Sequence, residues 1–252
     1  MIFNAKYPSK ADIQALGNRR PVSAADNLDS FHDVIVDKPW GNEYLLFENC
    51  DVAVWILHIE AGQQTSMHCH PKKNTSLIVL GGEAICKTLD NDFSLTTGQG
   101  IYIGKNVFHQ SINSATEQLV MMEIESPVDK FDLVRLEDGY GRISCGYESA
   151  EDCEKKYGQT IENNLSNQVA KKCLVGDSMI TIGYAETIDE LDVSLQGIGH
   201  ATLSILDRHV WTAEGQKFYQ VGQAFKFGEH LSPDNLNINT GFHYLLISGT
   251  IK

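Results

Sequence analysis

The stretch Gly62-Gln-Gln-Thr-Ser-Met-His68-Cys-His70, with Gly82 twelve residues beyond it, carries the clearest chemical signal in this chain. Successive side chains of a β-strand point to opposite faces, so His68 and His70 point the same way. A third imidazole follows in the stretch Gly98…His109-Gln-Ser-Ile-Asn113, on a later strand. Three histidines of this kind can hold Fe(II), Zn, Mn, Ni or Co. The sequence therefore predicts one divalent metal ion bound by His68, His70 and His109.

Short apolar runs, punctuated by Gly, Asn and Asp, surround these histidines and predict strands. Their spacing of roughly 8–12 residues is typical of an all-β sandwich or barrel. The runs lie at 44–47, 52–57, 77–80, 83–86, 101–103 and 119–122. Strands are predicted again beyond Cys173, at 179–182, 201–206, 217–221, 224–227 and 243–247.

A chain of 252 residues is long for one average domain, and its pattern divides it into four parts. Residues 1–35 are predicted to form an N-terminal arm with short helices, because Ser9 to Asp12 and Ser23 to Asp26 have capping-box spacing. A barrel at 36–145 is followed by a helical linker at 146–172, with another capping box from Ser149 to Asp152. Residues 173–252 form an additional, smaller C-terminal β-rich unit. A degenerate second barrel there stays open, although it has no second His-x-His.

The two histidine stretches resemble the two motifs of the cupin superfamily. The first matches G-x5-H-x-H-x4-E-x6-G at every spacing, but Thr75 stands at the glutamate position. The second is similar to G-x5-P-x-G-x2-H-x3-N, with Gly104 and Asn106 in place of the proline and the inner glycine. The resemblance implies a double-stranded β-helix (jelly-roll) barrel that brings the three histidines together. Without the glutamate, Asn74 or Thr75 could add an oxygen ligand.

Two flanking elements narrow the resemblance to one family within the cupin superfamily. Lys38-Pro-Trp40-Gly41 precedes the barrel, and a segment ending in Glu137-Asp-Gly-Tyr-Gly-Arg142 closes it. Both are similar to the type II mannose-6-phosphate isomerase cupin, the C-terminal part of mannose-1-phosphate guanylyltransferases. That family usually has Gln at the position of His68, and an Arg and a Glu where this chain has Lys73 and Thr75. The tryptophan of the first element is interpreted as a core residue.

The resemblance implies an aldose–ketose isomerase that acts on a sugar or sugar phosphate. In such an enzyme the metal polarises the carbonyl and hydroxyl oxygens, while a base moves a proton between adjacent carbons. Glu123 is implied as the base or as a carboxylate beside the metal, unless it points into solvent. Lys73 and Arg142 are candidates for binding the substrate's anionic group. An ion pair with Glu137 or Asp138 is the structural alternative for Arg142.

Two other functions stay open. A three-histidine Fe(II) dioxygenase would use the open metal positions for O₂ and substrate. A non-catalytic sugar-binding cupin in polysaccharide synthesis would account for the additional β unit. The histidines of that unit (His200, His209, His230 and His243) match no metal signature. Its aromatic residues are interpreted as core rather than as a sugar-stacking surface: Trp211, Phe218, Tyr219, Phe225 and Phe227.

The net charge of −13 argues against nucleic acid or an anionic membrane as a partner, since both require a basic face. A few local Lys or Arg residues can still bind an anionic substrate. The chain has no run of 18 apolar residues, its N-terminus is unlike a signal peptide, and its six cysteines show no CxxC spacing. We therefore expect a cytoplasmic protein with reduced thiols. A homodimer paired through barrel edges is one assembly that the sequence allows.

Overall fold

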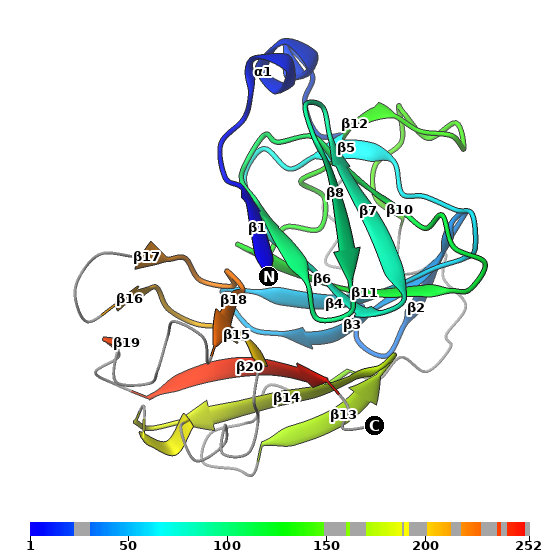
Figure 1. The fold of residues 1–252 in the computed structure, drawn as a ribbon. Coiled ribbons are helices and arrows are strands. Elements are labelled where there is room, and N and C mark those ends of the chain that lie inside the picture. The colour runs from blue at the N-terminus through cyan, green and yellow to red at the C-terminus, as the bar shows by residue number, and fades with distance from the viewer. Residues whose placement is uncertain are drawn as a thin grey trace.

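The computed structural model of the chain consists mainly of β-sheets (Figure 1). It describes residues 1–22, 31–148, 160–161, 170–187, 189–191, 201–212, 218–227, 236–237 and 241–249. No helix within these ranges is long and apolar enough to cross a membrane. The predicted all-β class is confirmed, because every run of apolar residues predicted as a strand contains a strand of the structure.

Two sheets packed face to face make the double-stranded β-helix. The seven-stranded sheet has the order β1-β9-β6-β11-β4-β3-β2, and the five-stranded sheet has the order β12-β5-β10-β7-β8. Apolar side chains from both sheets, such as Trp55 on one and Cys86 on the other, fill the space between them. The strands of the first sheet are β1 (Ile2–Ala5), β9 (Gly100–Ile103), β6 (Asn74–Gly81), β11 (Leu119–Ser126), β4 (Ala53–Ile59), β3 (Gly41–Glu48) and β2 (Ile35–Lys38). Those of the second are β12 (Val134–Glu137), β5 (Met67–Cys69), β10 (His109–Ile112), β7 (Glu83–Thr88) and β8 (Asp92–Thr96).

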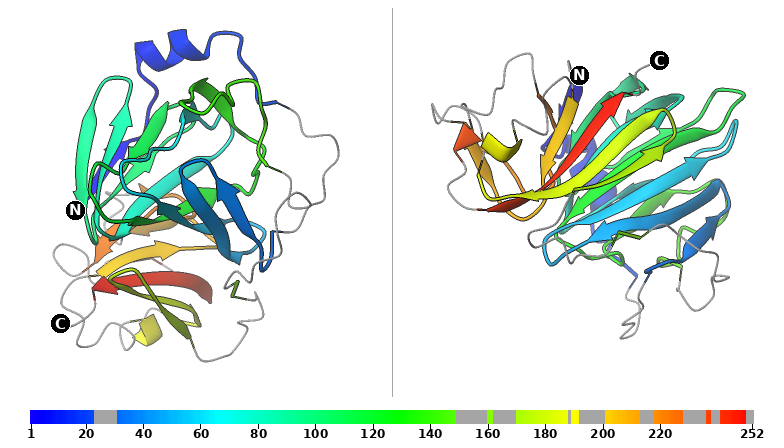
Figure 2. Two further views of the ribbon diagram at one scale, coloured as in Figure 1. Left: turned by 90° about the vertical axis from the view of Figure 1, so that its right-hand side faces the viewer. Right: turned by 90° about the horizontal axis from the view of Figure 1, so that it is seen from below.

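A third sheet covers the outer face of the seven-stranded sheet (Figure 2). One hydrophobic cluster joins the two, with Ile78 and Met122 on one side and Ile180 and Leu245 on the other. The third sheet has the order β13 (Lys171–Val175), β14 (Ser178–Ala185), β20 (Phe242–Gly249), β15 (Ala201–Ile205) and β18 (Phe225–Phe227). A small fourth sheet contains β17 (Phe218–Tyr219), β16 (Val210–Thr212) and β19 (Leu236–Asn237). The third sheet therefore buries β6 and β11 on both faces, which explains their nearly continuous apolar sequence.

The N-terminal segment joins the seven-stranded sheet through β1, which pairs in parallel with β9. This pairing was not predicted, because four residues without clear alternation carry no periodic signal. Two of the predicted capping boxes, at Ser23 and Ser149, lie outside the described residues. Most of the segment 146–172, predicted to be a helical linker, also lies outside them.

Helix α1 (Lys10–Leu16) ties the N-terminal segment to the histidine strands. The Ser9 hydroxyl accepts a hydrogen bond from the Asp12 N–H, and the Asp12 carboxylate accepts one from the Ser9 N–H. The predicted capping box is thus confirmed. The other Asp12 oxygen accepts from the Phe108 N–H at 2.9 Å. The same carboxylate therefore caps the helix and fixes the backbone next to His109.

The Pro-Trp-Gly element forms a tight hairpin between β2 and β3. Lys38 pairs with Gly41 across the turn, and Trp40 is buried in the core between the sheets, as interpreted from the sequence. Gly41 has a φ of +141°, and a Cβ placed on it would lie 2.0 Å from the His58 carbonyl oxygen. Only glycine allows β3 to approach β4 this closely.

Replacing Gly41 by alanine should therefore lower the free energy of unfolding by roughly 3 kcal/mol, through the collision as well as the unfavourable φ. Gly62→Ala is the matched control, because Gly62 also has a positive φ, of +70°, but open space around it. That control should cost about 1 kcal/mol. Urea denaturation of both variants tests the difference, and equal losses would contradict the collision.

Candidate metal centre and cavity

The three predicted histidines come together on neighbouring strands of the five-stranded sheet. His68 lies on β5 directly opposite His109 on β10, and His70 follows β5. The ring centroids of His68 and His109 are 4.5 Å apart, and that of His70 lies 5.1 and 5.3 Å from them. Met67 and Cys69 point to the opposite face, where they pack in a separate apolar cluster. The alternation of the strand therefore aims all three imidazoles at one point.

Backbone carbonyl groups fix the orientation of all three imidazole rings. The Nδ1 atoms of His68, His70 and His109 lie 2.8, 2.6 and 3.0 Å from the carbonyl oxygens of Ser66, Asp132 and Val107. A carbonyl oxygen only accepts hydrogen bonds, so each Nδ1 must carry the proton. Each Nε2 is then left with its lone pair free, which is the form in which histidine binds a metal.

The Nε2 atoms provide the test of whether a metal fits. Those of His70 and His109 are fully buried and have no hydrogen-bond partner among the described residues. One candidate ligand atom from each of the three histidines lies within 4.8 Å of the others. Burial lowers the pKa of His109 to about 4 and places the pKa values of His68 and His70 well below the usual value. The rings are neutral at physiological pH, and the cluster fits a divalent metal ion.

Two carboxylates from β11 lie beside the histidines. Glu123 Oε1 lies 3.9 Å from His70 Nε2, and His70, Glu123 and Glu125 form a second group that could hold a metal. Burial, followed by the charge of Glu125, raises the pKa of Glu123 to about 7. Glu125 was not singled out from the sequence, although its position two residues after Glu123 on the same strand face was the available signal.

The glutamate position of the first motif lies next to these carboxylates. Thr75 is buried and pairs across the sheet with Glu125. Its hydroxyl has no hydrogen-bond partner among the described residues. The neighbouring Asn74 donates a hydrogen bond to Gln220 of the C-terminal region, at 2.7 Å, on the opposite face of the strand. Of these two residues, only Thr75 therefore faces the interior.

A network of buried charges surrounds the carboxylates. Lys73, another of the candidates, is only 1% exposed, and its Nζ lies 2.5 Å from Glu125 Oε1. Lys130 Nζ lies 3.1 Å from Glu43 Oε1 and 3.9 Å from Glu125 Oε1. It also lies 3.6 Å from the centre of the Trp55 ring. These pairs offset the cost of burying the charges, because each ion has a close counter-charge.

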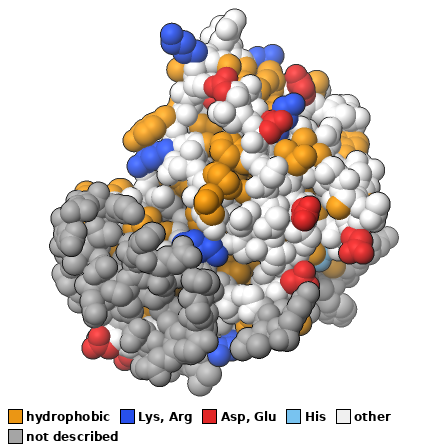
Figure 3. Space-filling model, viewed as in Figure 1, with side chains coloured by type: hydrophobic (Ala, Val, Ile, Leu, Met, Phe, Trp, Pro, Cys, Tyr) orange, Lys and Arg blue, Asp and Glu red, His pale blue; other side chains and the backbone are white. Residues whose placement is uncertain are grey.

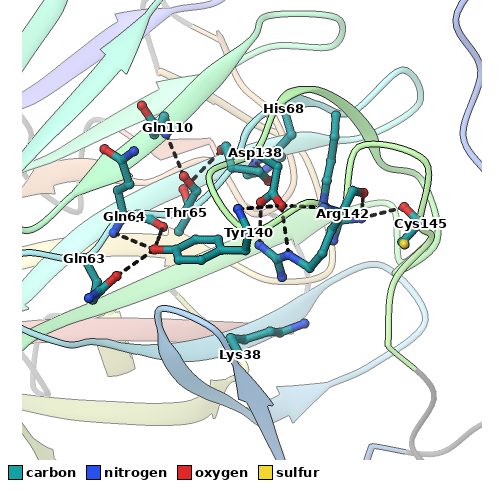
Figure 4. Close-up of polar contacts among 12 residues, drawn as sticks. Lys38, Gln63, Gln64, Thr65, His68, Gln110, Asp138, Tyr140, Arg142 and Cys145 are labelled. Atoms are coloured by element: carbon teal, nitrogen blue, oxygen red, sulfur yellow. Dashed lines mark hydrogen bonds and ion pairs between the residues drawn. The ribbon is translucent and has the colours of Figure 1, made fainter.

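Arg142 lines the cavity and is bound by two acidic side chains, of which Figure 4 shows Asp138. Its Nη2 lies 2.8 Å from Asp138 Oδ1, and its Nη1 lies 3.1 Å from Glu148 Oε1. The sequence left open an ion pair of Arg142 with Glu137 or Asp138, and the structure shows the pair with Asp138. The nearby Arg135 donates to the carbonyl oxygens of Cys145 and Gly146, at 2.6 and 3.0 Å. Both arginines therefore order the segment after β12.

The three histidines, Glu43, Glu123 and Glu125 line one cavity. On the outer face shown in Figure 3, acidic and basic side chains are scattered. The cavity instead gathers five cations from a chain whose net charge is −13. The cations are Lys38, Lys73, Lys130, Arg135 and Arg142. The sequence pointed to Lys73 and Arg142 through the family resemblance, and the folded barrel adds Lys38, Lys130 and Arg135.

The C-terminal aromatic residues divide between core and surface. Phe225 is buried, and Tyr219 packs against the same cluster. Trp211 is 50% exposed, and its ring centre lies 4.5 Å from that of Phe218. Among the described residues, every group of side chains that could hold a metal lies near β5, β10 and β11.

A jelly roll with converging histidines on one inner face is the arrangement typical of the cupin fold. The profile of the family described as "Mannose-6-phosphate isomerase C-terminal" matches residues 25–138, a little less than half of the chain. The resemblance seen in the motifs and flanking elements is thereby confirmed. No curated protein matches the chain.

Several solved structures are similar in fold. A sugar phosphate isomerase of the cupin superfamily from Silicibacter pomeroyi is 13% identical, with a TM-score of 0.32 over 34% of this chain and 59% of that one. KdgF from Halomonas sp. is 16% identical, with a TM-score of 0.36 over 39% and 90%. The capsular polysaccharide assembling protein CapF from Staphylococcus aureus is 15% identical, with a TM-score of 0.39 over 42% and 34%. At these values the likeness says nothing about activity or substrate.

The buried charges predict a specific response to acid. Burial by itself would raise the pKa of Glu43, but Lys130 and Lys38 outweigh it and lower the pKa to about 2, from 4.5. As the pH falls, the unfolded chain therefore binds this proton first. The interaction of the Glu43 carboxylate with Lys130 and Lys38 stabilises the fold above pH 4.5 by about 3 kcal/mol. That contribution is lost as the pH falls towards 2.

Glu43→Gln should accordingly be about 3 kcal/mol less stable than the wild type at pH 7, with a difference that shrinks below pH 4.5. Glu83→Gln makes the same charge change at an exposed position and should have little effect. Denaturant titrations at several pH values provide the measurement. A deficit that stays constant with pH would mean that packing, not charge, stabilises this site.

Proposed function

We propose that this chain is a metal-dependent cupin that acts on a sugar phosphate as an aldose–ketose isomerase. The observation that supports it best is the unpartnered, buried Nε2 pair of His70 and His109, beside the Glu123 carboxylate. A metal bound by His68, His70 and His109 would supply Lewis-acid polarisation of the substrate's carbonyl and hydroxyl oxygens. The family match at residues 25–138 agrees with this reaction class.

Glu123 has the properties required of the proton-transferring group. Burial raises the pKa of Glu123, which makes its carboxylate a stronger base than that of an exposed glutamate. It can accept the proton from the carbon next to the carbonyl and return it to the adjacent carbon. Lys73 forms an ion pair with Glu125. The charge of Lys73 thereby offsets part of the effect that the Glu125 charge has on the pKa of Glu123.

The cations of the cavity favour an anionic substrate. Five Lys and Arg side chains line the cavity itself, together with Glu43, Glu123 and Glu125, while Asp138 and Glu148 bind two of the cations from outside the lining. Cations gathered in a low-dielectric cleft attract anions even when the whole protein is acidic. Arg142, near the edge, offers the planar guanidinium that binds a phosphate group well.

Metal content is the first test. Elemental analysis by plasma mass spectrometry should find about one divalent metal per chain, in line with a three-histidine site. The double variant His68→Ala/His109→Ala should lose it while keeping its β-sheet circular dichroism. His58→Ala, a histidine on the outer face of β4, should retain the metal. Full retention by the double variant would overturn the site.

Turnover is the second test. With D-mannose 6-phosphate as the substrate, Glu123→Gln should lower kcat at least about 100-fold, because proton transfer by a side chain contributes that much. Metal content should stay unchanged if Glu123 acts as the base and fall if it is a ligand. Tight binding of the sugar phosphate without turnover by the wild type would instead support a sugar-binding cupin. Oxygen consumption with bound iron would support a dioxygenase.

A further inference from the structure

An internal carboxylate bridges two cations at the edge of the cavity. Glu148 forms an ion pair with Lys38 Nζ, and its Oε1 lies 3.1 Å from Arg142 Nη1. The Lys38 and Arg142 side chains are 3% and 14% exposed, whereas the Glu148 side chain is 27% exposed. The two cations thus belong to the cavity, and the carboxylate reaches them from its solvent side.

Without Glu148, the negative charge around Lys38 would be insufficient to balance the charge of its ammonium group. Lys38 Nζ lies 3.6 Å from Glu43 Oε1, but Lys130 and the Tyr147 hydroxyl bind the same carboxylate. Burial lowers the pKa of Lys38, so its ammonium form depends on nearby anions. Arg142 keeps Asp138 as a partner on its other side. An anion at the position of Glu148 is therefore what this pair of cations requires.

The two cations that bind Glu148 also line the cavity. Tyr147, the residue before Glu148, fills part of the same space and lies under Lys38, whose Nζ is 3.7 Å from its ring centre. Moving Glu148 away would leave both cations free to bind an anion that enters the cavity.

We propose that Lys38 and Arg142 form the subsite for the phosphate group of a phosphate monoester, and that Glu148 occupies this subsite as an internal competitor. A carboxylate bridging a lysine and an arginine uses the same charge-assisted hydrogen bonds that a phosphate would make. The ligand therefore binds by displacing Glu148, and its apparent affinity is reduced by the fraction of molecules in which Glu148 is in place. This inference rests on the proposed function for the identity of the monoester as a sugar phosphate.

The test is calorimetric titration of the metal-loaded protein with inorganic phosphate, with D-mannose 6-phosphate and with D-mannose. Glu148→Gln should bind both phosphate ligands about tenfold more tightly than the wild type, since it removes the competing charge. Neutral mannose should show no such gain. Glu137→Gln is the matched control, because it removes an exposed carboxylate of the same segment and should leave the affinities unchanged.

A second variant separates the subsite from a general charge effect. Adding Arg142→Gln to Glu148→Gln should abolish the gain in phosphate affinity. Glu148→Ala, checked by thermal melting, should reproduce the gain if the glutamine variant folds poorly. An unchanged affinity in both Glu148 variants, or an equal gain in Glu137→Gln, would overturn the subsite. A gain in phosphate affinity without any isomerase turnover would support the subsite and reject the isomerase. Turnover without a gain in phosphate affinity would support the isomerase and reject the subsite.

Discussion

The burial of two carboxylates on one strand is the constraint around which the cavity is organised. Strand β11 lies in the middle of the seven-stranded sheet, and its inward face carries Glu123 and Glu125. A buried carboxylate without a counter-charge costs several kcal/mol, so cations must be brought to it. Lys73 directly precedes β6, and Lys130 lies in the segment after β11. Each forms an ion pair with Glu125. The charges of the cavity are thus a consequence of where these carboxylates lie.

The C-terminal sheet makes that burial complete. Alternate residues of β11, such as Met122 and Ile124, face a second core shared with the C-terminal strands. Ser76 on β6 anchors the contact, because its hydroxyl donates to the Gly222 carbonyl and accepts from the Ala224 N–H. The outer face of the central strands is thereby buried against the C-terminal sheet. The raised pKa of Glu123 depends on the desolvation of this sheet, since burial is its largest cause.

The sequence predicted the features that have local signals. The His-x-His spacing places two rings on one face, and Ser9 with Asp12 marks a helix start. The inner glycine of the second motif is replaced by Asn106, whose φ of +65° is one that asparagine tolerates better than most residues, so the turn survives the change. The partners of the buried carboxylates were not predictable in this way. Their pairing depends on strand order, and several of the pairs join side chains more than 50 residues apart, such as Lys73 with Glu125 and Tyr147 with Glu43.

The replaced glutamate of the first motif illustrates how a barrel can relocate a charge. Thr75 removes a carboxylate from β6, which by itself argues for a neutral three-histidine site open to oxygen. Its cross-strand neighbours on β11 restore the charge, because Glu123 Oε1 lies 3.9 Å from His70 Nε2. A metal bound by the three histidines would therefore lie beside a carboxylate, although this carboxylate comes from β11 and not from β6. The missing glutamate of the first motif is therefore no sign of a purely neutral site, because a buried carboxylate from the neighbouring strand lies beside the histidines.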